Sequence, residues 1–193
     1  MKLNAPTLLT LSRIAVIPVF IVIYYLPVDW SNVVCTTLFV IAAITDWLDG
    51  YIARRYELSS RFGAFLDPVA DKLMVAVVLI LLVDRNPTEL PGLFLAIPAI
   101  IIIGREITIS ALREWMAELG EGGLVSVSYI GKVKTTAQLI ALPFMIHREP
   151  LWGMLPVAEI GLFLLYVAAF LTLWSMVIYL RGAWPILREN TEK

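Results

Sequence analysis

The sequence predicts an all-α integral membrane protein with six transmembrane helices and a short amphipathic segment at the N-terminus. Three observations predict this class. Hydrophobic residues make up 60% of the 193 residues and charged residues only 16%, whereas a soluble domain is about half apolar and about a quarter charged. The mean hydropathy is +0.83. Several apolar stretches approach the roughly 20 residues that cross about 30 Å of hydrocarbon.

Six apolar stretches follow one another along the chain. We expect spans at about residues 8–27, 31–53, 69–84, 92–112, 131–147 and 155–180, of which the third and fifth are the shortest. Backbone groups in lipid must form their hydrogen bonds internally, which excludes an open sheet. Nothing else intervenes, so residues 1–193 are predicted to form a single membrane domain.

Each span has polar residues at its ends. The amphipathic segment precedes the first span, and the second span runs into a charged stretch that begins at Asp46. Pro68 suits the first position of the third helix, and Asp67 before it suits an N-cap. Arg113 ends the fourth span, Lys132 begins the fifth, and the sixth is followed by further basic residues.

The basic residues are distributed unevenly over the two faces of the membrane. On these spans only Arg85 and Arg148, of the 15 Lys and Arg residues, fall on one side. An excess of Lys and Arg marks the cytoplasmic side. We therefore expect both termini to be cytoplasmic in the bacterial inner (plasma) membrane.

One motif stands out against this apolar background, with the pattern D-x2-D-G-x2-A-R-x8-G-x3-D-x3-D. Its members are Asp46, Asp49, Gly50, Ala53, Arg54, Gly63, Asp67 and Asp71. Carboxylates beside a membrane are costly and indicate a functional site by default. The charge distribution places this motif at the cytoplasmic face.

The four aspartates predict a metal site. Asp46 and Asp49 lie near the end of one helix, and Asp67 and Asp71 are four apart on the next, which places them on one face. Four carboxylates a few ångströms apart cannot all stay ionised unaided. Bound divalent cations resolve this conflict, and hard oxygen ligands without His or Cys favour Mg²⁺ or Mn²⁺.

The remaining members of the motif predict what the metals bind. Gly50, Ala53 and Gly63 remove side-chain bulk, so a flat or extended ligand can approach the backbone. Arg54 adds a permanent cation that can bind phosphate oxygens with two hydrogen bonds. Carboxylates, metals and Arg together predict phosphoryl transfer on a phosphate ester or pyrophosphate. Each residue alone has an ordinary explanation, such as helix packing for the small ones, but the full set at this spacing does not.

The motif resembles the signature of the CDP-alcohol phosphatidyltransferase family at all eight positions. These membrane enzymes transfer a phosphatidyl or similar group from a CDP-linked donor to an acceptor hydroxyl and release CMP. The resemblance implies that Asp46 and Asp67 contact both ions, Asp49 the first ion and Asp71 the second. It also implies that Asp71 is the general base. The implied CDP-binding residues are Thr7, Thr10, Gly50, Ala53, Arg54, Ser60 and Gly63.

The acceptor is predicted from four cations outside the motif: Arg105, Arg113, Lys132 and Lys134. Glu106 and Arg113 are seven apart on roughly one face, a spacing that allows them to pair. Positive-inside anchoring explains many such residues. However, four cations converging near a pyrophosphate site indicate an acceptor with a phosphate of its own.

Residues 6–13, 105–120 and 131–138 further resemble bacterial family members that use CDP-diacylglycerol and glycerol 3-phosphate. This implies attack by the 1-hydroxyl, with phosphatidylglycerophosphate and CMP as products, and a homodimer. The alternatives are the same family with serine, inositol phosphate or phosphatidylglycerol as acceptor, a divalent-cation transporter, and a membrane scaffold. All four aspartates lie at one end of the spans, which argues against a transport path. A scaffold leaves the aspartates unexplained.

Overall fold

The computed structural model describes residues 5–56, 61–120 and 129–191, with some side chains next to the gaps left out. It contains six α-helices and, within these ranges, no strand beyond an isolated bridge between Leu151 and Leu155. The helices are α1 (Ala5–Tyr25), α2 (Ser31–Tyr56), α3 (Arg61–Asp84), α4 (Leu93–Glu118), α5 (Tyr129–His147) and α6 (Val157–Thr191). The predicted all-α class is confirmed.

The helices are longer than the spans predicted from hydropathy. Helix α1 begins at Ala5, the first described residue, so the predicted amphipathic segment lies partly in α1 and partly outside the described residues. Helices α4 and α6 continue to Glu118 and Thr191, well beyond the predicted ends. Hydropathy detects only the part of a helix that suits hydrocarbon, whereas the helix itself continues into polar sequence.

Helix α3 begins earlier than predicted, which corrects the expected cap. It begins at Arg61, so Pro68 lies inside the helix and Asp67 is not an N-cap. An interior proline lacks the N–H group that would bond to the carbonyl four residues earlier. Membrane helices tolerate such prolines because neighbouring groups compensate, and α3 has α1 packed along it. The correction places Gly63, Asp67 and Asp71 on one continuous helix.

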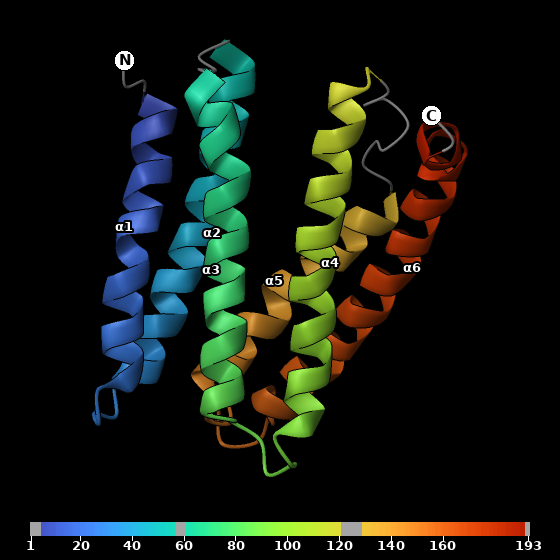
Figure 1. Ribbon diagram of the computed structural model, residues 1–193. Coiled ribbons are helices and arrows are strands. Elements are labelled where there is room, and N and C mark those ends of the chain that lie inside the picture. The colour runs from blue at the N-terminus through green and yellow to red at the C-terminus, as the bar shows by residue number, and fades with distance from the viewer. Residues whose placement is uncertain (1–4, 57–60, 121–128, 192–193) are drawn as a thin grey trace.

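The six helices form one bundle (Figure 1). Helix α1 packs against α2 and α3, while α4 packs against α6. Helix α5 crosses the bundle and contacts α2, α3 and α6, so it joins the two groups. The main core lies among these helices, and its largest fully buried side chains include Phe20, Phe39, Leu79, Ile102 and Met145.

The bundle has the surface of a membrane protein. Helices α1, α2, α4 and α6 each contain an apolar stretch long enough to cross a membrane. Large side chains such as Ile100, Phe163 and Phe170 are about two-thirds exposed, a pattern that marks contact with lipid or protein. Helix α3 carries four charged residues in its first half, and α5 has only 19 residues. The six-span count therefore stays a prediction.

The two ends of the bundle differ in charge. The start of α1 and the end of α6 lie at the same end (Figure 1), together with the aspartate motif. At the opposite end Arg148 donates to the Tyr24 hydroxyl and, at 3.2 Å, to the Arg85 carbonyl. Arg85 in turn lies over the Tyr25 ring, 4.7 Å from its centroid. Arg85 and Arg148, which were predicted to lie on the side opposite the other basic residues, thus connect the ends of α1, α3 and α5.

Candidate functional site

A buried arginine connects two aspartates of the motif. Arg13 lies inside α1, and its side chain is only 4% exposed. Its Nη1 donates to Asp46 Oδ1 on α2 at 2.7 Å and to Asp71 Oδ1 on α3 at 2.5 Å. The predicted approach of α2 and α3 carboxylates is thus observed for this pair. Sequence reasoning treated Arg13 only as one of many basic residues, although a charge well inside an apolar helix is itself a functional signal.

The third described aspartate is bonded to α1 as well. Thr10 is fully buried, and its hydroxyl donates to Asp67 Oδ1. Gly63 is also buried, one turn before Asp67 on α3. The i, i+4 spacing of Gly63, Asp67 and Asp71 gives all three the same helix face. Thr10, predicted to line the CDP pocket, therefore lies against a predicted metal ligand.

Some predicted site residues lie outside what the structure describes. Asp49, Gly50, Ala53 and Arg54 belong to the last turns of α2, but their side chains are not described; the same holds for Thr7 in α1 and Lys132 in α5. Ser60 lies outside the described residues. Among the described side chains no three acidic, His or Cys residues form one metal-binding group. The four-aspartate metal set stays a prediction.

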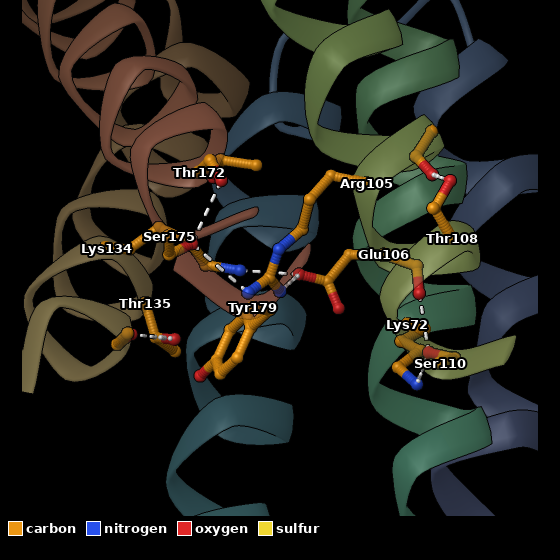
Figure 2. Close-up of polar contacts among 12 residues, drawn as sticks. Lys72, Arg105, Glu106, Thr108, Ser110, Lys134, Thr135, Thr172, Ser175 and Tyr179 are labelled. Atoms are coloured by element: carbon orange, nitrogen blue, oxygen red, sulfur yellow. Dashed lines mark hydrogen bonds and ion pairs between the residues drawn. The ribbon is translucent and has the colours of Figure 1, made fainter. Parts of the chain in front are cut away.

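A second polar cluster joins α4, α5 and α6 (Figure 2). Glu106 Oε1 accepts from Arg105 Nη1 at 2.9 Å and from Lys134 Nζ at 2.5 Å. Arg105 is 8% exposed and also donates through Nη2 to Ser175 Oγ at 3.2 Å. A buried charge must be paired and hydrogen-bonded to be tolerated, and the carboxylate of Glu106 serves both cations.

The spacing of Glu106 and Arg113 allows them to pair, but the structure pairs Arg113 with another residue. Arg113 instead donates to the Tyr179 hydroxyl at 3.4 Å and lies 5.3 Å from the centroid of that ring. Arg105 lies over the same ring at 5.5 Å. Both arginines are thus held by a tyrosine on α6, which sequence reasoning missed because Tyr179 is one aromatic residue among many in a long apolar helix.

The two clusters meet in one cavity of about 300 Å³. Its lining includes Asp71, Arg105, Glu106, Arg113, Lys134, Gln138 and Tyr179. The structure thus brings the predicted general base together with three of the four predicted acceptor cations. Since Arg105 and Arg113 are fixed by Tyr179, and Arg105 by Glu106 also, these donors are held in position before any ligand arrives.

Two further hollows continue from Asp71 toward the outer surface. A cavity of about 130 Å³ is lined by Arg13, Asp46 and Asp71 and shares Gln138 with the first. A groove of about 310 Å³ between α2 and α5 follows, with entirely apolar lining residues. They are Phe39, Val40, Ala43, Ile44, Trp47, Leu139 and Pro143. Carboxylates therefore lie between a cation-lined cavity and an apolar groove.

The structure is therefore that of a helical membrane protein with a cavity lined by carboxylates and cations, next to an apolar groove. Residues 3–174 match the family described as CDP-alcohol phosphatidyltransferase. The chain belongs to that family.

Curated relatives of the chain carry a more specific name. Proteins named CDP-diacylglycerol–glycerol-3-phosphate 3-phosphatidyltransferase match it over 95% of its length and 96% of theirs. The protein from Escherichia coli (strain K12) is 51% identical over 183 residues. The protein from Salmonella typhimurium (strain LT2) is 52% identical over 183 residues. The protein from Shigella flexneri serotype 5b is 51% identical over 183 residues.

Proposed function

We propose that this protein transfers the phosphatidyl group of CDP-diacylglycerol to the 1-hydroxyl of sn-glycerol 3-phosphate. The products are phosphatidylglycerophosphate and CMP. The names of the relatives support this reaction. The observation that carries it is the shared cavity, in which Asp71 and three cations line the same space. An acceptor with a phosphate at one end and a hydroxyl at the other fits that arrangement.

The acceptor half of the reaction rests on this cavity. The phosphate of glycerol 3-phosphate is held by Arg105, Arg113 and Lys134, with Lys132 as a further candidate. Arg105 Nε is buried and has no partner among the described residues, so a phosphate oxygen would satisfy it. Asp71 takes the proton of the 1-hydroxyl. The hydroxyl oxygen then bonds to the phosphorus that bears the diacylglycerol, and the bond from that phosphorus to the CMP oxygen breaks.

The donor half rests on the aspartate motif. Asp46, Asp49, Asp67 and Asp71 would hold two Mg²⁺ or Mn²⁺ ions, and these ions would neutralise charge on the transferring phosphate. The donor set fits, because oxygens of Asp46 and Asp71 already lie within hydrogen-bond distance of one Arg13 nitrogen. The CDP moiety contacts Gly50, Arg54 and Ser60, with Ala53 and Gly63 leaving room and Thr7 and Thr10 nearby. An acyl chain of the donor lies in the apolar groove between α2 and α5.

The setting of the reaction is also part of the proposal. The chain acts as one domain in the bacterial inner membrane, with the site and both termini on the cytoplasmic side. CDP-diacylglycerol then enters from the inner leaflet and glycerol 3-phosphate from the cytosol. We also propose a homodimer, on the resemblance alone.

The test is CMP release by the purified protein in mixed micelles containing CDP-diacylglycerol and Mg²⁺ or Mn²⁺. Glycerol 3-phosphate, serine, inositol phosphate and phosphatidylglycerol are offered separately. We expect CMP release with glycerol 3-phosphate only. Activity with serine and none with glycerol 3-phosphate would refute the acceptor. Metal uptake into sealed vesicles without any nucleotide lipid would instead support a transporter.

A further inference from the structure

Glu106 is an acidic residue inside a cavity otherwise suited to an anion. Its side chain is 22% exposed, and it lines the cavity with Arg105 and Lys134. A carboxylate beside a phosphate site weakens phosphate binding through like-charge repulsion. Positive-inside anchoring does not explain it either, because that rule concerns Lys and Arg. Pairing with Arg105 and Lys134 accounts for one oxygen of the carboxylate, which leaves the other oxygen to be explained.

The two oxygens of Glu106 have different surroundings. Oε1 accepts both hydrogen bonds, from Arg105 and from Lys134. Oε2 has no hydrogen-bond partner among the described residues, and Figure 2 shows it turned away from the two cations. A carboxylate oxygen is a strong acceptor, so Oε2 is available to a hydroxyl group in the cavity.

We propose that Glu106 determines the specificity for the acceptor, and this inference rests on the proposed function. Through Oε1 it holds Arg105 and Lys134 in place for the acceptor phosphate. Through Oε2 it accepts a hydrogen bond from the 2-hydroxyl of glycerol 3-phosphate. That hydroxyl sits on the carbon between the phosphate arm and the attacking 1-hydroxyl. Glu106 lines the same cavity as the cations that hold the phosphate and Asp71, which takes the proton.

The experiment compares two acceptors in the full-length enzyme: glycerol 3-phosphate and 3-hydroxypropyl phosphate, which lacks only the 2-hydroxyl. A hydrogen bond to a charged group predicts that the wild type prefers glycerol 3-phosphate by about tenfold or more in kcat/KM. In Glu106→Leu the preference falls to about one. In Glu106→Gln, which keeps the shape without the charge, it falls several-fold. Glu114→Gln, an exposed residue on the same helix, keeps the wild-type preference.

The ratio separates specificity from a purely structural role. If Glu106→Leu and Glu106→Gln lower kcat/KM equally for both acceptors, Glu106 only organises the cations and the proposal is wrong. An absence of preference in the wild type also overturns it. If Glu106→Leu does not fold, Glu106→Gln alone decides. A wild type that releases CMP with another acceptor and not with glycerol 3-phosphate refutes the proposed function itself.

Discussion

At the scale of single residues, the site depends on buried cations that are held by carboxylates. Arg13 binds Asp46 and Asp71, and Glu106 binds Arg105 and Lys134. Removing a carboxylate leaves a buried cation less well compensated, which destabilises the fold. Substitutions that keep the shape of the side chain are therefore the informative ones, because they separate chemistry from folding.

Asp71→Asn tests the general base. Asparagine keeps the shape of the side chain but cannot take the proton of the acceptor hydroxyl. Since general-base catalysis contributes about 10²–10⁴-fold, we expect kcat for CMP release to fall by at least about a hundredfold. Asp84→Asn is the control, because that carboxylate lies at the other end of α3, where it accepts from the Tyr25 hydroxyl. Near-normal turnover in an Asp71→Asn protein that still binds metal would refute the assignment.

Arg105→Lys tests the acceptor phosphate site. The guanidinium reaches Glu106 and Ser175 while lying over the Tyr179 ring, and an ammonium group cannot reproduce this planar geometry. We expect the KM for glycerol 3-phosphate to rise about tenfold, as befits one lost charged hydrogen bond, while the KM for CDP-diacylglycerol stays unchanged. Arg181→Lys, on the exposed surface of α6, serves as the control. Equal rises in both KM values would indicate general damage instead.

At the scale of elements, the sequence predicted that side chains of α2 and α3 converge, but it misplaced the start of α3. The spacing of Asp46 and Asp71 predicted that α2 and α3 bring their carboxylates together, because helical periodicity fixes the face of each residue. The start of α3 was misplaced because Pro68 suits a first helical turn and an interior position of a packed membrane helix alike. Arg13, Glu106 and Tyr179 were assigned no partner or the wrong one, since pairing between distant helices leaves no local pattern.

Gly161→Ala tests the contact between α5 and α6. An added Cβ at Gly161 would lie 2.6 Å from Met145 Cγ and 2.9 Å from the Ala141 carbonyl oxygen. Overpacking of this kind costs about 1–3 kcal/mol, so we expect the melting temperature in detergent to fall by at least about 2 °C. Gly104→Ala on α4 is the matched control, because its Cβ would meet nothing within 4 Å. An unchanged melting temperature for Gly161→Ala would show that α5 and α6 can move apart to admit the methyl group without loss of stability.

At the scale of the whole molecule, the bundle keeps its reactive groups at one end. Asp71 of the aspartate motif and the cluster around Glu106 line a single cavity near that end. Asp71 and Asp46 also line the adjoining cavity, from which the apolar groove continues along α2 and α5. Arg85 and Arg148 lie at the opposite end. A lipid substrate and a water-soluble one can thus reach the same aspartate by different routes, provided that this end faces the cytosol.

The orientation of the bundle can be tested with single cysteines in intact cells. Met154 lies in the turn between α5 and α6 and is 91% exposed, and Leu119 lies at the end of α4 and is 39% exposed. These positions belong to opposite ends of the bundle (Figure 1). Because the excess of basic residues marks the cytoplasmic side, we expect a membrane-impermeant maleimide to label Met154→Cys in intact cells. We expect Leu119→Cys to be labelled only after the membrane is opened.

The native cysteine provides the background for this measurement. Cys35 is fully buried, so the unaltered protein should remain unlabelled under both conditions. Both variants must also retain CMP release, which shows that they are folded. Labelling of Leu119→Cys in intact cells, with Met154→Cys protected, would show that the protein has the opposite orientation in the membrane. The site would then open away from the cytosol, and a soluble phosphorylated acceptor made inside the cell would have no route to Asp71.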